Sequence, residues 1–184
     1  RIFTGNSKTN GIQLKLTYPQ AHTLIAQVIL IRYLEDRNIL DEAYFRERVA
    51  GENKQWQNYL NQAPDKSNLL NPEIADRFFP RVLADRDFTV ALFQQLAVDF
   101  NGDIFAGDRE YSFVKAEHLK YIQRFLLANN LESQGKLFLW AYQFDVIPLE
   151  LISSIYEEFY HGSNKEGKIK DKNGTHYTPS VLVE

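Results

Sequence analysis

Apolar residues recur at helical spacing through most of this chain, and that period limits what it can fold into. The clearest case begins near residue 19 and ends near residue 37, with few polar breaks. An apolar period near 3.6 over such a length predicts a helix that is buried on most sides. The residues that carry the period are Leu24, Ile25, Val28, Ile29, Ile31 and Leu34.

The same period predicts further helices along the chain. Asp41 is placed to cap one that Gly51 ends, and residues 52–62 form the next. Two longer amphipathic stretches follow at residues 88–100 and 115–129. The sequence therefore predicts an all-α fold, a multi-helix N-terminal bundle with at most one or two short strands.

Prolines mark other expected boundaries. Asn71-Pro72 is typical of a helix start, and Pro80 is expected to end or kink that helix. Pro148 opens a helix that Gly162 ends. Residues 137–142 are short and apolar enough to form either a strand or a buried helix.

These signals divide the chain into four parts. Residues 1–19 are polar and irregular, residues 20–162 form a helical domain, and residues 163–175 form an exposed basic loop. Residues 176–184 read as the start of another helix, opened by Thr178 and the proline after it. Because the chain stops on the first turn of that helix, we expect it to be a fragment of a longer protein.

Composition excludes several classes of function. The chain has no cysteine among its 184 residues, so disulfides, thiolate metal sites and a cysteine nucleophile are excluded. It has no apolar run near the roughly 18 residues that a membrane span needs, and no signal peptide is recognisable. The net charge of -3 gives no overall nucleic-acid signature. Aromatic residues make up 14%, which predicts an aromatic-rich core.

A run of charges closes the first long helix. It comprises Arg32, Glu35, Asp36 and Arg37, followed by Asn38. Charge runs at helix ends usually face solvent, so we expect a solvated helix end with local ion pairs. Asn38 suits the left-handed conformation that follows a helix.

Metal sites are not predicted. Asp99 begins a stretch with oxygen ligands at calcium-loop spacing, ending at Glu110, but the sixth position is Ile104 where the loop's sharp turn requires glycine. A helix C-terminal turn at Asn101-Gly102 is therefore expected instead. The four histidines lie far apart and never four positions from one another: His22, His118, His161 and His176.

The basic loop allows two interpretations. Its four lysines could contact phosphate, or the loop could be a solvated linker, as such surface loops commonly are. The lysines are Lys165, Lys168, Lys170 and Lys172.

Four segments together resemble one known family. Ile29–Leu40 resembles an R-F-L-E-D-R-G-I-L segment, and Phe100–Phe105 resembles an F-N-G-x-L-F turn. Phe144–Phe159 resembles a Y-D-F-S-x-I-P-V-E-L-L-G-S-I-Y-E-x-F segment, and His176–Val183 resembles the Y-Y-T-P-x-x-L-V element called motif X. In this order they are similar to bacterial DNA adenine-N6 methyltransferases, namely type I modification subunits and fused restriction–modification enzymes.

The resemblance implies a helical domain followed by a Rossmann-like domain that binds S-adenosyl-methionine, at whose start this chain is truncated. Tyr177, Thr178 and Pro179 would occupy the motif X positions that help to hold the methionine end of the cofactor. The family's F-x-G-x-G cofactor loop and its N/D-P-P-aromatic catalytic loop are absent from this sequence. The chain itself is therefore expected to be inactive and to bind the cofactor poorly.

The full-length protein would be a cytoplasmic bacterial restriction–modification enzyme. It would transfer a methyl group from S-adenosyl-methionine to adenine N6 in DNA, with double-stranded DNA as partner and specificity or restriction subunits as further partners. The helical domain would contact DNA or those subunits. The alternative is a stand-alone helical protein-interaction module with no catalytic role.

Overall fold

The described part of the chain is mainly helical in the computed structural model. It covers residues 16–63, 75–100, 105, 111–127, 148, 150 and 154, and the backbone of residues 8–9 and 12–13. The helices are α1 (Tyr18–Asp36), η1 (Tyr44–Ala50), α2 (Lys54–Asn61), α3 (Phe79–Val82), α4 (Arg86–Phe100) and α5 (Ala116–Leu126). Two-residue strands β1 (Lys8–Thr9) and β2 (Ile12–Gln13) pair antiparallel. An all-α class is therefore confirmed for these residues.

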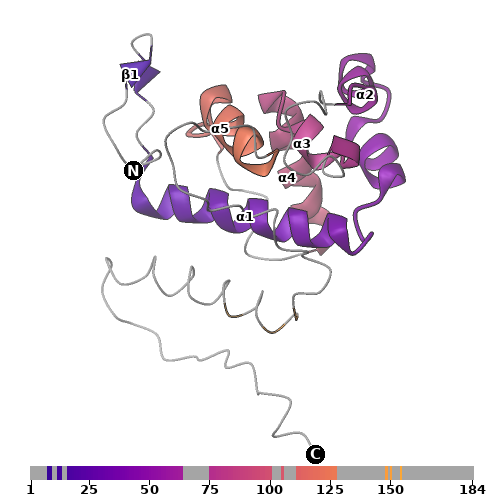
Figure 1. The fold of residues 1–184 in the computed structure, drawn as a ribbon, viewed down its shortest axis with the longest axis horizontal. Coiled ribbons are helices and arrows are strands. Elements are labelled where there is room, and N and C mark those ends of the chain that lie inside the picture. Colours follow the sequence, from indigo (N-terminus) through magenta and orange to yellow (C-terminus); the bar gives the residue numbers. More distant parts are fainter. Residues whose placement is uncertain are drawn as a thin grey trace, which may run out of the picture.

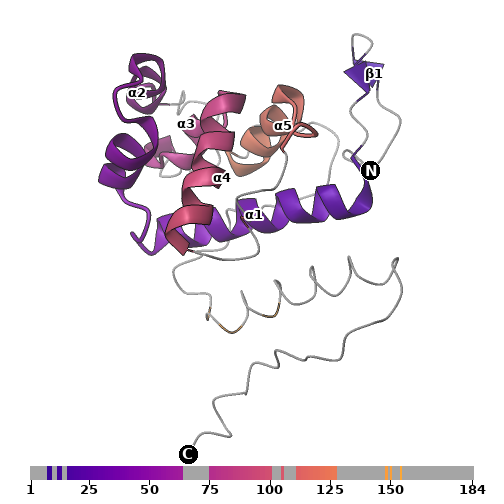
Figure 2. The ribbon, with the colours of Figure 1, turned by 180° about the vertical axis from the view of Figure 1, so that it is seen from behind.

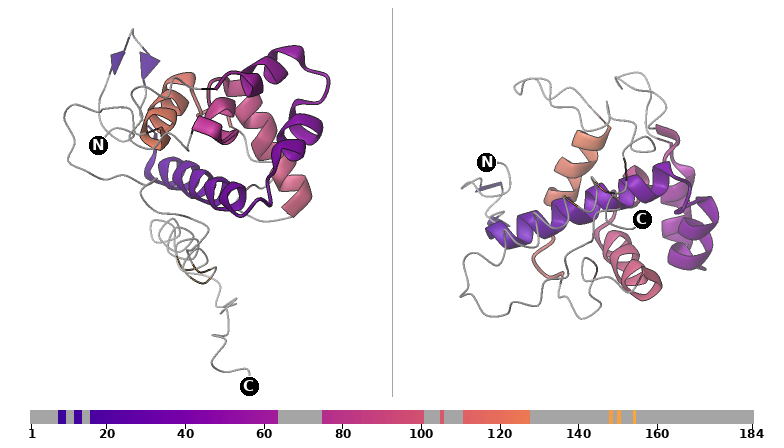
Figure 3. Two further views of the ribbon diagram at one scale, coloured as in Figure 1. Left: turned by 45° about the vertical axis from the view of Figure 1, so that its right-hand side comes forward. Right: turned by 90° about the horizontal axis from the view of Figure 1, so that it is seen from below.

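Helix α1 forms one layer, and the other helices pack along one side of it (Figures 1 and 2). Seen from below, α1 crosses in front of the second layer (Figure 3). Within that second layer α2 and α5 lie at opposite ends, with α3 and α4 between them (Figure 1). A long apolar helix with a broad buried surface suits a layer that several helices pack against.

The ends of α1 follow from local chemistry. Thr17 and Gln20 form a capping box, in which the Gln20 side chain accepts from the Thr17 N–H at 2.9 Å and Thr17 Oγ1 accepts from the Gln20 N–H at 3.4 Å. Pro19 lies in the first turn, where its missing N–H costs nothing. After the last turn Asn38 adopts a φ of 56°, as the sequence predicts.

The helix predicted after Asp41 is present, and part of it is wound as a π-helix. Asp41 Oδ1 accepts from the N–H of Tyr44 at 2.8 Å, which confirms the predicted cap. The Gly51 N–H reaches back five residues to the carbonyl of Arg46 at 2.9 Å. The Gln57 side chain then donates to the carbonyls of Arg46 and Gly51, both at 2.9 Å. These bonds satisfy the end of η1 and join it to α2.

Pro80 corrects one prediction. It lies in the first turn of α3 and does not end or kink a helix that begins at residue 71. Residues 75–76 form only a short 3-10 turn, and residues 77–78 are not helical. A proline has no N–H to donate, so it suits a helix start as well as a helix end. Residues 71–74 lie outside the described part.

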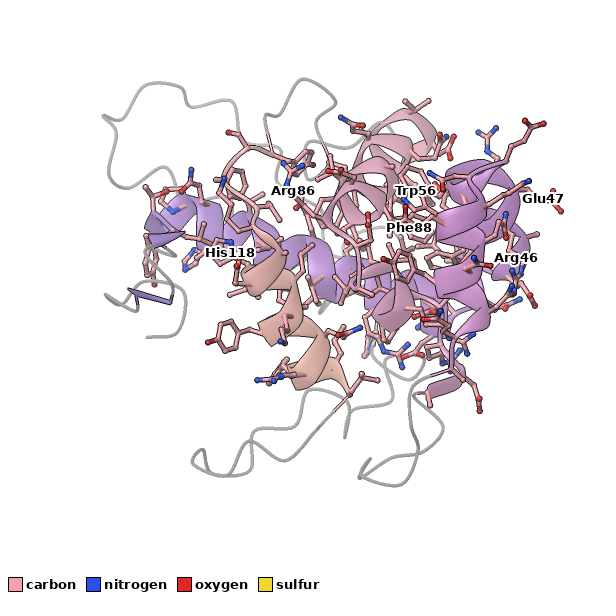
Figure 4. All side chains as sticks on the ribbon, turned by 90° about the horizontal axis from the view of Figure 1, so that it is seen from above. Arg46, Glu47, Trp56, Arg86, Phe88 and His118 are labelled. Carbon is pink, nitrogen blue, oxygen red and sulfur yellow. The ribbon has the colours of Figure 1, made fainter. Side chains whose placement is uncertain are left out.

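The core is rich in aromatic rings, as predicted. The Phe93 ring centre lies 5.2 Å from that of Tyr111 and 6.0 Å from that of Phe105. Trp56 of α2 stacks on Phe88 of α4, with ring centres 4.9 Å apart and planes 3° from parallel (Figure 4). The largest side chains that are fully buried include Phe45, Phe79, Phe88, Phe93 and Phe105.

Candidate functional site

All seven residues that the sequence predicts to bind ligands lie outside the described residues. They are Tyr177, Thr178 and Pro179 for the cofactor, and Lys165, Lys168, Lys170 and Lys172 for nucleic acid. Their roles stay predictions. The described residues instead contain a buried ionic cluster, a surface carboxylate that holds η1, and an exposed basic helix face.

The ionic cluster lies where α1 ends, and we name it by its four side chains: Arg32, Glu35, Asp36 and Arg77. Arg32 Nη1 lies 3.1 Å from Glu35 Oε2, and Arg32 Nη2 lies 2.7 Å from Asp36 Oδ1. Arg77 adds a second guanidinium, with Nη2 3.0 Å from Asp36 Oδ1. The Arg32 and Glu35 side chains are only 7% and 3% exposed. Buried charges persist only when they are paired, and here the Arg32–Glu35 pair is also hydrogen-bonded.

The prediction of a solvated helix end is therefore wrong for most of this run. The predicted local ion pairs are present, but of the four charged residues only Arg37 is exposed, and its guanidinium carbon lies 4.8 Å from the ring centre of Tyr33. The ion pairs within α1 follow from i, i+3 and i, i+4 spacing, but the burial does not. It arises because residues 77–79 pack over the end of α1.

Glu35 links α1 to the start of α3. Its Oε1 accepts from the backbone N–H of Phe78 at 2.6 Å and from that of Phe79 at 3.0 Å. The first N–H groups of a helix have no partner inside the helix, and Pro80 contributes none. Glu35 thus supplies the acceptor that the buried start of α3 requires, while its other oxygen faces Arg32.

Burial raises the pKa of Glu35, against the lowering effects of Arg32 and the two amides. A carboxyl whose pKa is raised by folding stabilises the fold most at low pH, and that contribution is lost as pH rises through its folded pKa. Glu35→Gln imitates the protonated form. We therefore expect the wild-type protein's free energy of unfolding, relative to that of Glu35→Gln, to fall as pH rises above about 4.5, by at most about 1.4 kcal/mol per pH unit.

Urea denaturation of both proteins at several pH values measures this difference, and the other carboxyls cancel because both proteins share them. A difference that grows with pH would contradict the raised pKa. It would mean that folding favours the ionised carboxylate of Glu35.

Asp99 holds η1 against α4. It accepts from the Tyr44 hydroxyl at 2.8 Å and from Gln95 Nε2 at 2.9 Å, and it pairs with Arg48 Nη2 at 2.6 Å. The hydrogen bonds from Gln95, Tyr44 and Arg48 lower the pKa of Asp99, and burial with the Asp99 contact raises the pKa of Tyr44. The first position of the calcium-like stretch is thus directed toward η1. Residues 101–104 and 106–110 lie outside the described part.

Helix α5 presents basic side chains that the sequence analysis did not single out. Lys115, Lys120 and Arg124 are exposed, whereas the opposite face of α5 is buried in the core. His118 belongs to that inner side, where it is buried and accepts from the Lys115 N–H through Nδ1 at 3.1 Å (Figure 4). The signal was available: Lys120 and Arg124 are four residues apart and opposite the apolar stripe.

Other kinds of site are not formed by the described residues. Among them, no three His, Asp or Glu side chains gather so that they could hold a metal ion. No helix within the same residues combines the length and the apolar character that a membrane crossing requires. Searches of protein-family models, curated proteins and solved structures found no match to this chain.

Proposed function

We propose that this chain is the helical region and motif X of a bacterial restriction–modification enzyme that methylates adenine N6 in DNA. The observation that carries the proposal is the order of four matching segments, from Ile29–Leu40 to His176–Val183. Four short matches in one order are much more specific than any one of them alone.

The geometry of the first matching segment supports the proposal. Arg32 and Glu35 of this segment are buried charges with specific partners, so only residues that make the same contacts fit these positions. Asn38 stands where the family segment has glycine, and it adopts a φ of 56°. Glycine and asparagine are the residues that tolerate this conformation best. The residue types of the resemblance thus agree with what the backbone requires.

The proposed cofactor site begins at motif X. Thr178 is suited to cap a helix that Pro179 begins, and the free amides of such a start suit the carboxylate of S-adenosyl-methionine. In the full-length enzyme a target adenine would leave the duplex, and its exocyclic amine would take the methyl group with loss of a proton. In this proposal the helical domain supplies a wall for DNA or for partner subunits.

The proposal predicts that this chain alone transfers no methyl group, because it lacks the cofactor loop and the catalytic loop. Incubation with labelled S-adenosyl-methionine and adenine-containing duplex DNA tests this, and methyl transfer by the chain alone would contradict it. The protein extended along its own reading frame should methylate the same DNA.

The coding sequence beyond Glu184 gives the sharper test. We expect an F-x-G-x-G loop and then an N/D-P-P-aromatic motif within the domain that follows. A stop codon directly after Glu184 would instead favour the stand-alone helical interaction module. Val98 and Phe100, which are 74% and 44% exposed near the end of α4, would then be the first candidates for a protein contact.

A further inference from the structure

Most arginines of the described residues already have a carboxylate partner. Five of them lie within ion-pair distance of an Asp or Glu side chain, so their charge is locally compensated. A compensated surface guanidinium has little charge left for an external anion. These arginines are Arg32, Arg46, Arg48, Arg77 and Arg86.

Helix α5 differs from this pattern. None of the ion pairs found among the described residues involves Lys115, Lys120 or Arg124. The stretch 111–127 holds these three cations against one carboxylate, Glu117, so its net charge is +2. The protein as a whole carries -3, which makes the basic surface of α5 a local exception.

The arrangement of these side chains fits a phosphate backbone. Lys120 and Arg124 are one helical turn apart, about 6 Å along the axis, and Lys115 precedes the first turn. Phosphates on one DNA strand rise by about 3.4 Å per nucleotide, so cations about 6 Å apart roughly match two nucleotide steps, about 7 Å, of the same strand. Tyr121 lies half-buried beside Lys120 and offers a hydroxyl, another common phosphate donor.

The buried face of α5 fixes this surface in place. Leu119, Ile122 and Leu126 are at most 5% exposed, so the helix cannot turn its cations inward. Helix α5 lies at one end of the helical layer, at the opposite end from α2 (Figure 1).

We propose that Lys120 and Arg124 on the exposed side of α5, together with Lys115 at its N-cap, form a basic face that binds the phosphate backbone of double-stranded DNA. The inference extends the proposed function, because it names the surface through which the helical domain contacts DNA. Phosphate contacts of this kind position a protein on DNA and carry no sequence preference of their own.

The test is duplex binding by the 184-residue chain, measured by fluorescence anisotropy with a labelled duplex of about 30 base pairs. Log affinity against log salt, between about 50 and 200 mM, should have a negative slope. Each of Lys115→Gln, Lys120→Gln and Arg124→Gln should reduce the magnitude of the slope by about 0.9, and the triple variant by about 3. The triple variant should bind about tenfold or more weakly near 0.1 M salt.

Matched control variants test whether DNA binding depends on the basic face of α5 or on the overall charge of the protein. Lys54→Gln removes an exposed lysine from α2 and should leave the slope unchanged. Glu117→Gln should strengthen binding. All substituted residues lie at the surface of α5 or α2, and an unchanged urea midpoint confirms that each variant folds.

The outcomes distinguish this inference from the proposed function. If the wild-type chain binds duplex DNA and the triple variant binds it equally well, the DNA-binding role of the α5 face is overturned, whereas the methyltransferase proposal stands. If the chain binds no duplex, the inference fails, while methyl transfer by the extended protein still decides the proposed function separately. If the protein bound polyglutamate as tightly as it binds duplex DNA, the inference would also be overturned, because the basic face of α5 would then bind any acidic polymer.

Discussion

Replacing Glu35 with alanine is expected to lower the free energy of unfolding by about 3–5 kcal/mol. The substitution removes a carboxylate that is 3% exposed and leaves the N–H groups of Phe78 and Phe79 buried without their acceptor. Arg32 keeps Asp36 at 2.7 Å but loses its second partner. Urea denaturation followed by circular dichroism measures the change.

Two further substitutions show which interaction matters. Glu35→Gln keeps an oxygen that can accept from both amides, so we expect it to cost much less than Glu35→Ala at any pH. Glu47→Ala changes the same residue type in η1, where the side chain points away from the other helices (Figure 4), and should cost less than about 0.5 kcal/mol. A loss for Glu35→Ala no larger than that for Glu47→Ala would contradict the role of the ionic cluster.

The helices themselves were largely predictable from the sequence. The apolar period near Leu24 and Val28 predicted α1 to within a residue or two at each end, and the caps at Asp41 and Asn38 were identified from residue type. These features depend on contacts between neighbours in sequence, which is why a pattern of residue types is enough to reveal them.

The ionic cluster could not be predicted in the same way. Glu35 accepts from amides that lie 43 and 44 residues later in the chain, so its burial depends on how α3 packs against α1. The sequence shows charges at a helix end, and most such charges are solvated. The position of Pro80 could not be predicted for the same reason. Whether a proline begins or ends a helix depends on whether the residues before it are helical, and residues 77–78 are not.

The basic face of α5 was only partly predictable from the sequence. The apolar period of residues 115–129 predicted the helix, and a net charge of -3 left a local basic face open without indicating where it lies. Net charge averages over the whole chain, whereas a ligand responds to the local field. Ion pairs elsewhere in the described part neutralise most arginines, and for Arg48 and Arg77 this compensation appears only once the fold brings the partners together.

The second large effect is expected for Phe88→Ala, which should lower the free energy of unfolding by about 3–5 kcal/mol. Phe88 is fully buried and stacks on Trp56, so the substitution leaves a cavity and removes the aromatic contact between α2 and α4 (Figure 4). Aromatic pairs of this geometry add about 0.5–1.5 kcal/mol beyond the area that they bury. Urea denaturation gives the loss, and a shift in tryptophan emission should report the changed surroundings of Trp56.

The same substitution elsewhere on α4 separates packing from helix propensity. Phe100→Ala removes an identical side chain that is 44% exposed near the C-terminal end of α4, and it should cost less than about 1 kcal/mol. Phe88→Leu keeps most of the buried volume and should cost less than Phe88→Ala. Equal losses at residues 88 and 100 would mean that the Trp56 stack contributes little. In that case α2 is held mainly by Gln57, whose side chain already joins it to the end of η1.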